Sequence, residues 1–409
     1  MWHMQDSNDQ PAGQGDGGQE SQYAQLGVDA HKTGVKKSFK PVIDNDYPLA
    51  FCNIVKDRLN PGYVLTQHMD GDGSKMLQRL LHYHETGDAT VFRGAVDDAW
   101  SMNTGDIAAS GFVDELFLTD VININGISAP KDVIMEQLAI RIAELKQLYI
   151  EHGFDVTFFG GETADLPDQV KTVVFDICAS SRVHETGLIE GNIEPGDAIF
   201  GMASDGQVAW EKEGNSGIMS NGLTMARIKL MHANYVNKHP ELMRQEKPFE
   251  GRFSIHGMDE RLGTMSVSEA IMSPTRQWAL VIKRIIDGLR SHDSLHLLHG
   301  VVMNTGGGAT KVLNIGRNIH YVKKMPIPPP IFQLIKFESG EEWENMFTAF
   351  NCGVGIDIIG SDKGGVLQDV LNSVSEWTRV KLFRLGDCHH SESPDNLVTL
   401  YTPYGEFAY

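Results

Sequence analysis

The segment at residues 131–152 is the feature that most constrains the fold of this chain. Apolar residues recur along it at spacings of three and four: Ile134, Leu138, Ile142, Leu145 and Tyr149. This spacing places the apolar side chains on one face of an α-helix, and the preceding Pro130 is typical of a helix start. β-Prone segments lie on both sides, at residues 116–124 and 154–159. A long amphipathic helix between two strands predicts a fold with both helices and sheets.

The remaining pattern extends this interpretation along the chain. It predicts further strands at residues 63–68, 171–179 and 198–203 and helices at residues 75–86 and 91–103. Strands and helices are interspersed without regular alternation, which favours an α+β fold over a doubly wound sheet. A length of 409 residues suits two domains of roughly 150–200 residues each.

Four segments are therefore expected. The polar, Gly/Pro-punctuated stretch at residues 190–197 predicts a domain boundary. Residues 1–22 are too poor in apolar side chains to order themselves and are expected to form a disordered tail. The expected segments are the tail at 1–22, an N-terminal domain at 23–192, a C-terminal domain at 193–390 and an extension at 391–409. Within the C-terminal domain, the weakly patterned residues 237–265 are expected to form an insertion.

Charge and cysteine content exclude several classes of protein. The formal net charge is −19 and no basic block occurs, which argues against a general binder of nucleic acid or anionic membranes. The four cysteines are widely spaced, which predicts no disulfide framework or zinc site and favours a reduced, cytoplasmic compartment. No signal peptide or apolar run of membrane-spanning length is expected. None of the 16 histidines stands in a metal-binding spacing.

A loop at residues 70–75 combines chemistry that suits a metal–phosphate site. It contains two carboxylates (Asp70 and Asp72), two glycines (Gly71 and Gly73), Ser74 and Lys75, between an expected strand and an expected helix. Glycines allow backbone N–H groups to approach an anion at a helix N-terminus. The carboxylates could bind Mg²⁺ and the lysine a phosphate, although a capped turn explains the same residues. The loop is not a Walker A motif.

Two further acidic motifs follow in the first half. Asp106 is expected to begin a helix, where an aspartate most often serves only as a cap. Glu162 and Thr163 follow Gly160 and Gly161 at the expected end of an apolar strand, and an ordinary turn is the alternative. Three acidic strand or loop ends in one half favour a shared divalent-metal site.

The second half contains four loops of small residues. Each could simply be a turn that connects regular elements. Arg276 could either bind a phosphate or lie on the surface. The loops occupy residues 220–223 (S-N-G-L), 273–276 (S-P-T-R), 304–308 (N-T-G-G-G) and 350–355 (F-N-C-G-V-G).

These motifs, in this order, resemble the aminoimidazole ribonucleotide (AIR) synthetase family, also called phosphoribosylformylglycinamidine cyclo-ligase. The resemblance runs from residue 23 to about residue 386, and the chain is similar to a divergent, long branch of the family. It implies two α+β domains and a homodimer in which the N-terminal sheets pair into a β-barrel. It also implies that ATP binds between this barrel and the C-terminal domain, under a segment matching residues 26–37. The implied reaction closes the imidazole ring of formylglycinamidine ribonucleotide in purine biosynthesis and releases ADP and phosphate.

The resemblance also implies roles for individual residues. Asp70, Asp106 and Glu162 are expected to bind Mg²⁺ directly or through water. Lys75 is expected to meet ATP phosphate, and Ser220 and Asn221 to line the region of substrate and γ-phosphate. The expected catalytic residues are Asp70, Lys75, Asp106 and Asn221. The expected nucleotide-binding residues are Gly71, Gly73, Ser74, Gly160, Gly161 and Thr163, and the expected substrate-binding residues are Ser220, Arg276, Gly306, Gly307 and Gly308.

The chain departs from the family pattern at several positions. Family members have a histidine two residues before the asparagine of S-N-G, and here Met219 occupies that position. The preceding loop, residues 207–216, is longer and carries acidic and basic side chains, among them Glu211. Asp72 stands where a small apolar residue is usual, and Gly105 replaces the asparagine before Asp106.

These departures keep two other hypotheses open. One is another ATP-using enzyme of the same superfamily, such as a selenophosphate synthetase, a thiamin-phosphate kinase or a hydrogenase-maturation dehydratase. The other is a nucleotide-binding paralogue that has lost turnover, for which Met219 is the main support. Retention of Asp70, Lys75, Asp106 and Glu162 favours an active ligase.

Overall fold

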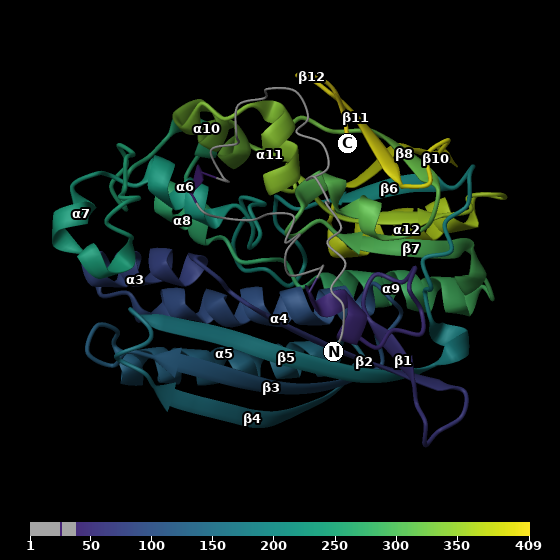
Figure 1. Ribbon diagram of the computed structural model, residues 1–409, viewed down its shortest axis with the longest axis horizontal. Coiled ribbons are helices and arrows are strands. Elements are labelled where there is room, and N and C mark those ends of the chain that lie inside the picture. The colour runs from purple at the N-terminus through teal and green to yellow at the C-terminus, as the bar shows by residue number, and fades with distance from the viewer. Residues whose placement is uncertain (1–24, 27–37) are drawn as a thin grey trace, which may run out of the picture.

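The computed structural model describes residues 25–26 and 38–409 and contains two β-sheets with helices between and around them (Figure 1). The expected tail, and all but Leu26 of the segment expected to cover ATP, lie outside the described residues.

The first sheet has five strands in the order β1-β2-β5-β3-β4. Their bounds are β1 Ile54–Lys56, β2 Tyr63–Gly71, β3 Glu115–Ile124, β4 Asp155–Asp165 and β5 Val173–His184. Neighbours are antiparallel except β3 and β4, which are parallel and are joined through a helix, as parallel pairs require. Side chains alternate between a buried and a more exposed face, so only one face of this sheet is covered within the chain.

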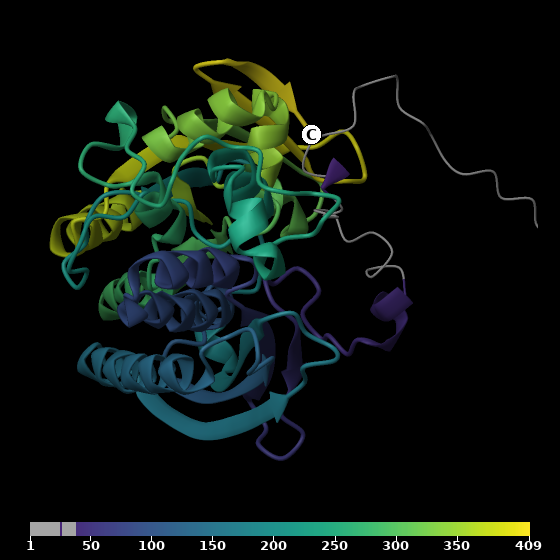
Figure 2. The ribbon, with the colours of Figure 1, turned by 90° about the vertical axis from the view of Figure 1, so that its left-hand side faces the viewer.

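Three helices lie on the side of the buried face. They are α3 Lys75–Thr86, α4 Arg93–Ala108 and α5 Lys131–Glu151, and the short η2 Ala89–Phe92 joins the first two. Two of them, α4 and α5, contact the strands of the sheet. Helix α4 contacts β2 and β5 on one side and α9 (Trp278–Ser291) of the other half on the opposite side. Figure 2 shows the resulting order of layers, from the first sheet through these helices to the second half. Because α4 lies between the two halves, its residues 93–108 are almost all buried.

The second sheet has seven strands in the order β12-β11-β8-β10-β6-β9-β7. The strands are β6 Ala198–Ala203, β7 Leu298–Met303, β8 Ile319–Lys324, β9 Val354–Gly360, β10 Leu382–His390, β11 Leu397–Thr402 and β12 Gly405–Ala408. The helices of this half are α6 Leu223–Leu230, α7 Tyr235–Lys238, α8 Val267–Met272, α9 Trp278–Ser291, α10 Pro330–Ser339, α11 Trp343–Ala349 and α12 Val366–Thr378. Short 3₁₀ turns are η1 Lys40–Val42, η3 Glu185–Gly187, η4 Pro240–Leu242, η5 Glu260–Leu262, η6 Leu295–Leu297 and η7 Gly308–Asn314.

The predicted α+β composition is confirmed, and most predicted elements lie where the periodicity placed them. The helix predicted at 75–86 and the strand predicted at 198–203 have those bounds, and α5 ends one residue before its predicted end. Neither of the two sheets formed by the described residues closes on itself, so the barrel expected for a dimer stays a prediction. The domain limits expected from the sequence also stay predictions.

The residues expected to form an insertion, 237–265, join the two halves of the molecule. His239 and Lys238 both contact Glu85 at the end of α3, each at 2.6 Å. Lys171, before β5, donates to the carbonyl of Met243 at 3.2 Å. The insertion therefore ties the second half to the first sheet and its helices. Among the described residues, no helix is long and apolar enough to cross a membrane.

Candidate active site

The predicted strand–loop–helix arrangement of residues 70–75 is confirmed. Strand β2 ends at Gly71 and α3 begins at Lys75. Gly73 has a positive φ of 59°, and the space where a side chain would lie is open, so glycine is required by conformation rather than by crowding. The Asp70 carboxylate accepts the Gly71 N–H at 2.8 Å. Burial raises the pKa of Asp70, because the charged form loses contact with water.

Asp106 does not begin a helix, and that expectation was wrong. It lies in the last turn of α4, which continues through Gly105 to Ala108. Because glycine weakens a helix interior, Gly105 favoured the expectation that a helix begins after it, at Asp106. Here a Cβ on Gly105 would lie 2.6 Å from the methyl carbon of Met303, so the glycine lets β7 pack closely on the helix.

The end of α4 and the end of β2 bring together a polar cluster that includes Asp106. His68 Nε2 lies 3.4 Å from Asp106 Oδ2, and Lys311 Nζ lies 3.9 Å from the same oxygen. Asn103 Oδ1 lies 3.0 Å from His68 Nδ1, and the Asn103 amide donates to the backbone carbonyl of Asp70 at 3.0 Å. Asp106 Oδ1 is buried and has no hydrogen-bond partner. We call Asp70, His68, Asn103, Asp106 and Lys311 the α4–β2 cluster.

Sequence reasoning missed three members of this cluster. His68 was passed over because it stands in no metal-binding spacing, although its position two residues before Asp70 on a strand places both side chains on one face. Asn103 precedes Asp106 by three residues on the same helix face, which is also visible in the sequence. Lys311 comes from η7, more than 200 residues further along the chain, and carries no local signal.

Lys75 is buried beneath the loop instead of facing solvent. Its ammonium donates to Asp98 Oδ1 at 2.9 Å and to the Ser273 carbonyl at 2.8 Å. Burial lowers the pKa of Lys75 to about 8, although the Asp98 carboxylate opposes this change. Contact of Lys75 with a phosphate stays a prediction, since the described contacts already use two of its three donors.

Asp98 is the buried centre that connects several of the predicted motifs. Besides Lys75, it accepts hydrogen bonds from Arg79, from Ser220 Oγ at 2.7 Å and from both the N–H and the hydroxyl of Thr275 at 2.7 Å. Burial alone would raise the pKa of Asp98, but Lys75 and Arg79 outweigh it and hold the pKa below its usual value. Asp98 thus links the 70–75 loop, S-N-G and S-P-T-R, and its sequence context gave no hint of this.

Asp72 is expected to make stability depend on pH. Arg79 Nε lies 3.5 Å from Asp72 Oδ2, but neither atom has a hydrogen-bond partner. Burial raises the pKa of Asp72 to about 7, although Arg79 opposes it. Between about pH 4 and pH 7 the folded state therefore binds more protons at Asp72 than the unfolded state does. Protonation of Asp72 stabilises the fold below that window, and this stabilisation is lost as pH rises through it.

Replacing Asp72 tests this expectation. Asp72→Asn should raise the free energy of unfolding at pH 8.5 by about 1–3 kcal/mol and change it little at pH 4. Urea unfolding of both proteins at the two pH values measures the difference. An equal effect of the substitution at both values would show that Asp72 titrates normally.

Ser220 and Asn221, in the S-N-G turn before α6, differ in how far their side chains are hydrogen-bonded within the protein. Ser220 Oγ is held by Asp98 and lies 3.0 Å from the Thr275 hydroxyl. The Asn221 amide donates to the Ala349 carbonyl at 2.7 Å, while its Oδ1 is buried without a partner. Ser74 Oγ lies 3.3 Å from the hydroxyl of Thr224 in the first turn of α6. Of these side chains, Asn221 offers an unsatisfied acceptor to a ligand.

The glycine loops of the second half pack on one another. A Cβ on Gly222 would lie 2.0 Å from the Phe350 ring, and one on Gly308 would lie 2.3 Å from the Phe350 carbonyl. Gly307 and Gly308 have φ values of 104° and 54°. Gly306 faces open space. S-N-G, T-G-G-G and F-N-C-G-V-G therefore form one packed unit, and the three glycines at 306–308 precede Lys311 of the α4–β2 cluster.

Arg276 is fully engaged within the protein. Its guanidinium binds Glu211 at 2.9 and 3.1 Å and the carbonyls of Ala203, Asp205 and Gly206 at 2.7–3.1 Å. It lines a cavity of 810 Å³ together with Arg79, Arg141 and the 207–216 loop. Glu211 of the lengthened loop thus neutralises the arginine, and a direct substrate contact of Arg276 stays a prediction.

Glu162 does not lie at a strand end, and that expectation was wrong. Strand β4 continues through the glycine pair to Asp165, with a bulge in β4 between Phe158 and Gly161, opposite Leu118 and Asp120 of β3. Asp70, Ile177, Asp120 and Gly161 are successive partners across the sheet. Three strand spacings of about 4.8 Å separate the backbone of Asp70 from the edge strand by roughly 14 Å.

The outer edge of the sheet therefore presents its own group of predicted residues. Gly160 has a φ of 78°, and a Cβ on Gly161 would lie 1.7 Å from the Asp120 carbonyl. Glu162 and Thr163 are exposed on the edge strand and pair with Val121 and Ile122 of β3. Within one chain these residues are not brought to the α4–β2 cluster, and among the described residues no three acidic, histidine or cysteine side chains form a metal-binding group.

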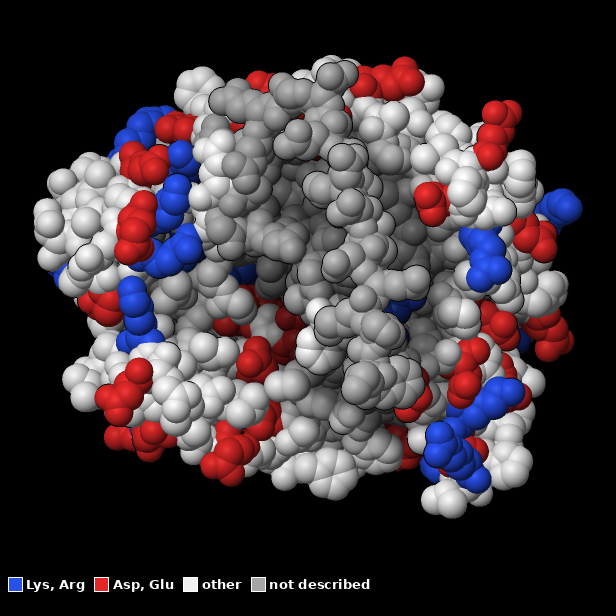
Figure 3. Space-filling model, in the orientation of Figure 1, with Lys and Arg blue, Asp and Glu red and all other residues white. Residues whose placement is uncertain are grey.

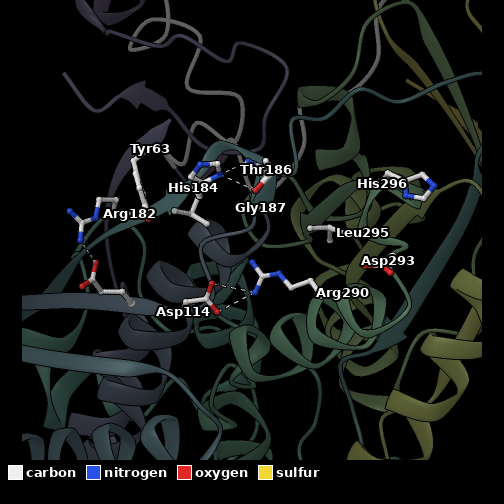
Figure 4. Close-up of a pocket in the computed structure, with 12 residues that line it drawn as sticks. Tyr63, Asp114, Arg182, His184, Thr186, Gly187, Arg290, Asp293, Leu295 and His296 are labelled. Atoms are coloured by element: carbon white, nitrogen blue, oxygen red, sulfur yellow. Dashed lines mark hydrogen bonds and ion pairs between the residues drawn. The ribbon is translucent and has the colours of Figure 1, made fainter. Parts of the chain in front are cut away.

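A second cavity, of 540 Å³, contains none of the predicted site residues (Figure 4). Its two arginines both face carboxylates: Arg290 lies 3.2 Å from Asp114, and Arg182 lies 3.7 Å from Glu115. Because these charges are already matched, the cavity gives no basis for assigning a ligand.

Met219, at the position of the family histidine, is buried and adopts a positive φ of 54°. A residue other than glycine, asparagine or aspartate in this conformation is uncommon. The side chain cannot transfer a proton, so any proton handling at this site must involve other groups.

Comparisons with known proteins place the chain in a family by overall sequence similarity. No family model matches the chain. It is 30% identical over 401 residues to the phosphoribosylformylglycinamidine cyclo-ligase of Pyrococcus furiosus, covering 93% of this chain and 98% of that protein. It is 28% identical to the protein of the same name from Pyrococcus horikoshii, covering 87% and 92% of the two chains.

A solved structure supports the fold. The chain is similar to phosphoribosylformylglycinamidine synthase II of Thermotoga maritima with a TM-score of 0.51 and 13% identity, covering 95% of this chain and half of that one. At this identity the likeness concerns the fold alone. The match to the Pyrococcus furiosus protein extends over nearly the whole of both chains, and this chain belongs to the phosphoribosylformylglycinamidine cyclo-ligase family.

Proposed function

We propose that this chain catalyses the ATP-dependent cyclisation of formylglycinamidine ribonucleotide to AIR, with release of ADP and phosphate. The near full-length match to a cyclo-ligase carries the proposal. The packing of the predicted motifs supports it. Asp98 joins three of them, and the glycine loops precede Lys311, which reaches the α4–β2 cluster.

The described residues suit the positioning of a phosphorylated substrate. Lys311 supplies a partly exposed ammonium beside Asp106, and its second contact is the Thr305 hydroxyl at 3.1 Å. This ammonium is better placed than that of Lys75 to meet a phosphate. Asn221 Oδ1 can accept a hydrogen bond from a substrate N–H, since it has no partner of its own. Phosphoryl transfer depends mainly on such positioning and charge neutralisation.

Asp70 and Asp106 also fit the Mg²⁺ that this chemistry requires. Both are carboxylates, which are preferred ligands of Mg²⁺, and Asp106 Oδ1 is a buried oxygen without a partner. When bound, Mg²⁺ would neutralise charge on the phosphoryl group. Glu162 could join these ligands only from a second copy of the chain, because its own strand lies three strands from β2.

We also infer that the protein forms a homodimer through the uncovered face of the first sheet. Apolar side chains on that face are exposed to an unusual degree, with Met69 at 58% and Phe159 at 71%. A cavity of 600 Å³ on the same face is lined by Leu65 and Phe117. Large apolar side chains gathered on one exposed face are typical of an interface. The expected cytoplasmic location stays a prediction.

A charge on this face should produce monomers. We expect Phe159→Glu to lower the mass measured by light scattering from that of two chains to that of one, because a buried, unpaired carboxylate opposes association. Ile327→Glu, at a residue that is 68% exposed in the second half, is the matched control and should leave the mass unchanged. A dimer that persists with Phe159→Glu would contradict this interface.

The proposed reaction is tested by measuring ADP release with Mg²⁺-ATP, with and without formylglycinamidine ribonucleotide. We expect release to depend on this substrate. ADP release that is equally fast without it would contradict the cyclo-ligase. ATP binding without turnover would instead support a binding paralogue, the alternative favoured by Met219.

A further inference from the structure

The placement of Lys311 depends on η7, a 3₁₀ helix of 7 residues. The Lys311 ammonium lies 3.1 Å from the Thr305 hydroxyl and 3.9 Å from Asp106 Oδ2. It also lies 5.1 Å from the centre of the Phe51 ring, and the side chain is 18% exposed. Hydrogen-bond geometry in a 3₁₀ helix is poor, and runs longer than about three or four residues are uncommon. A run as long as η7 therefore needs support from outside the helix to keep Lys311 in place.

Asn396 supplies this support at the C-terminal end of η7. Its side-chain amide donates to the carbonyls that follow one another there, those of Leu313, Ile315 and Gly316, at 2.8–3.3 Å. Its Oδ1 accepts the Ile319 N–H at 3.0 Å. The amide nitrogen faces three acceptors and Oδ1 faces a donor, so the orientation of the amide is fixed. The last carbonyls of a helix have no partner within it, and here a side-chain donor satisfies them. Asn396 therefore joins the end of η7 to the start of β8.

The C-terminal hairpin of β11 and β12 packs against α11, which contacts η7. The ring of Tyr404 stacks on that of Trp343, with the centroids 4.0 Å apart and an angle of 2° between the planes. The ring centroids of Phe407 and Phe347 lie 6.1 Å apart. The Phe347 carbonyl in turn lies 2.5 Å from the position of a Cβ on Gly308, the first residue of η7. The C-terminal residues thus hold η7 directly at its end and through α11 at its start.

A fixed ammonium matters at this place because the chain is acidic. Its formal net charge is −19, and Figure 3 shows acidic side chains where the two halves meet, with few basic ones among them. Carboxylates repel a phosphate that enters beside Asp106 unless a cation is already in position. Lysine carries its charge on a flexible stem, and a misplacement of about 1 Å in a site can cost about 100-fold in rate. The contacts that hold η7 therefore govern how well Lys311 meets a phosphate.

We propose that Asn396 is a positioning residue, which holds η7 so that the Lys311 ammonium meets the phosphate of a bound ligand. The inference rests on the phosphate contact of Lys311 in the proposed function, and it extends the site to the C-terminal residues. Two ligands of the proposed reaction carry such a group, a nucleoside triphosphate and a ribose phosphate.

The test is a double-mutant cycle on the full chain. Calorimetry measures the affinity for Mg²⁺-ATP and, separately, for ribose 5-phosphate. Lys311→Met removes the charge and keeps the stem, and the probe whose binding it weakens identifies the phosphate that Lys311 meets. Asn396→Ala should weaken binding of the same probe by roughly tenfold. In the Lys311→Met background, Asn396→Ala should change that affinity by less than about twofold, because the ammonium that it positions is gone.

Asn125→Ala is the matched control for the loss of hydrogen bonds. The Asn125 amide donates to the carbonyls of Pro167 and Val170 at 3.4 and 3.2 Å, and its Oδ1 accepts the Ile127 N–H at 3.1 Å. This partly buried residue follows β3 in the first half, and its replacement should keep both affinities within about twofold. If urea unfolding shows that Asn396→Ala does not fold, Asn396→Ser, which keeps one donor, takes its place in the cycle.

Each outcome decides the inference. A loss of affinity in Asn396→Ala that disappears in the Lys311→Met background supports it. Losses of equal size in both backgrounds would show that Asn396 supports the fold alone and would overturn the inference. Unchanged affinity in Asn396→Ala, or in Lys311→Met for both probes, would overturn it as well. Because binding needs no turnover, a protein that shows the coupling but forms no AIR would refute the proposed reaction and leave this inference standing. A protein that forms AIR while the two effects add would do the reverse.

Discussion

Asp98→Ala should destabilise the protein by about 3–5 kcal/mol, a large share of the about 5–15 kcal/mol that stabilises a typical fold. The substitution removes the carboxylate that balances the ammonium of Lys75 and the guanidinium of Arg79, and all three side chains are almost fully buried. It also frees the N–H and hydroxyl of Thr275 and the hydroxyl of Ser220. The substitution leaves the Lys75 ammonium without its carboxylate partner and Arg79 with Asp72 alone, and an uncompensated buried charge costs far more than the contacts themselves contribute.

Urea unfolding followed by circular dichroism measures this loss. The matched control is Glu250→Gln, which breaks the partly exposed ion pair of Lys229 and Glu250 and should cost no more than about 1 kcal/mol. Equal, small effects of the two substitutions would show that Asp98 is not the centre that connects the motifs. If Asp98→Ala yields no folded protein, Asp98→Asn, which keeps volume and one acceptor, should fold with a smaller but still measurable loss.

Asp106→Asn should lower turnover by more than about 100-fold and leave the free energy of unfolding nearly unchanged. Asparagine has the same shape and keeps one oxygen, but it has no negative charge to offer a metal ion or Lys311. Asp106 Oδ1 has no hydrogen-bond partner in the fold, so little structural energy depends on it. Asp106→Asn should therefore cause a large loss of turnover together with only a small change in the free energy of unfolding.

Steady-state ADP release and urea unfolding of the same preparations measure the two effects. Asp155→Asn, at the exposed start of β4, changes a carboxylate of the same half outside the cluster and should keep full turnover. Turnover that Asp106→Asn leaves within about threefold of the unchanged protein would remove Asp106 from the catalytic set, since loss of a true ligand costs at least tenfold.

The sequence was most informative where local chemistry determines structure. The apolar spacing of residues 131–152 and the Gly-rich break before Lys75 are local signals, and α5 and α3 lie where these signals placed them. The glycine loops at 306–308 and 350–355 were recognised as loops, although only the fold shows that Phe350 packs on both Gly222 and Gly308.

The sequence was least informative where a distant residue overrides the local signal. Asp106 was expected to begin a helix, but α4 continues through Gly105, because Met303, almost 200 residues away, fills the space that the glycine leaves. In the sequence Arg276 is available to bind a phosphate, but in the structure its guanidinium is bound by the Glu211 carboxylate. The glycine pair before Glu162 suggested a turn, but pairing with β3 extends the strand through it. Such pairings depend on the fold, and no local pattern encodes them.

The most direct test of the proposed reaction is the amount of AIR formed per ADP released when the purified protein is given Mg²⁺-ATP and formylglycinamidine ribonucleotide. Mass spectrometry identifies AIR by the loss of one water from the substrate, and a coupled assay counts ADP. The account predicts equal amounts of the two products, and loss of both in Asp106→Asn. ADP release without AIR, or consumption of neither substrate despite ATP binding, would contradict it.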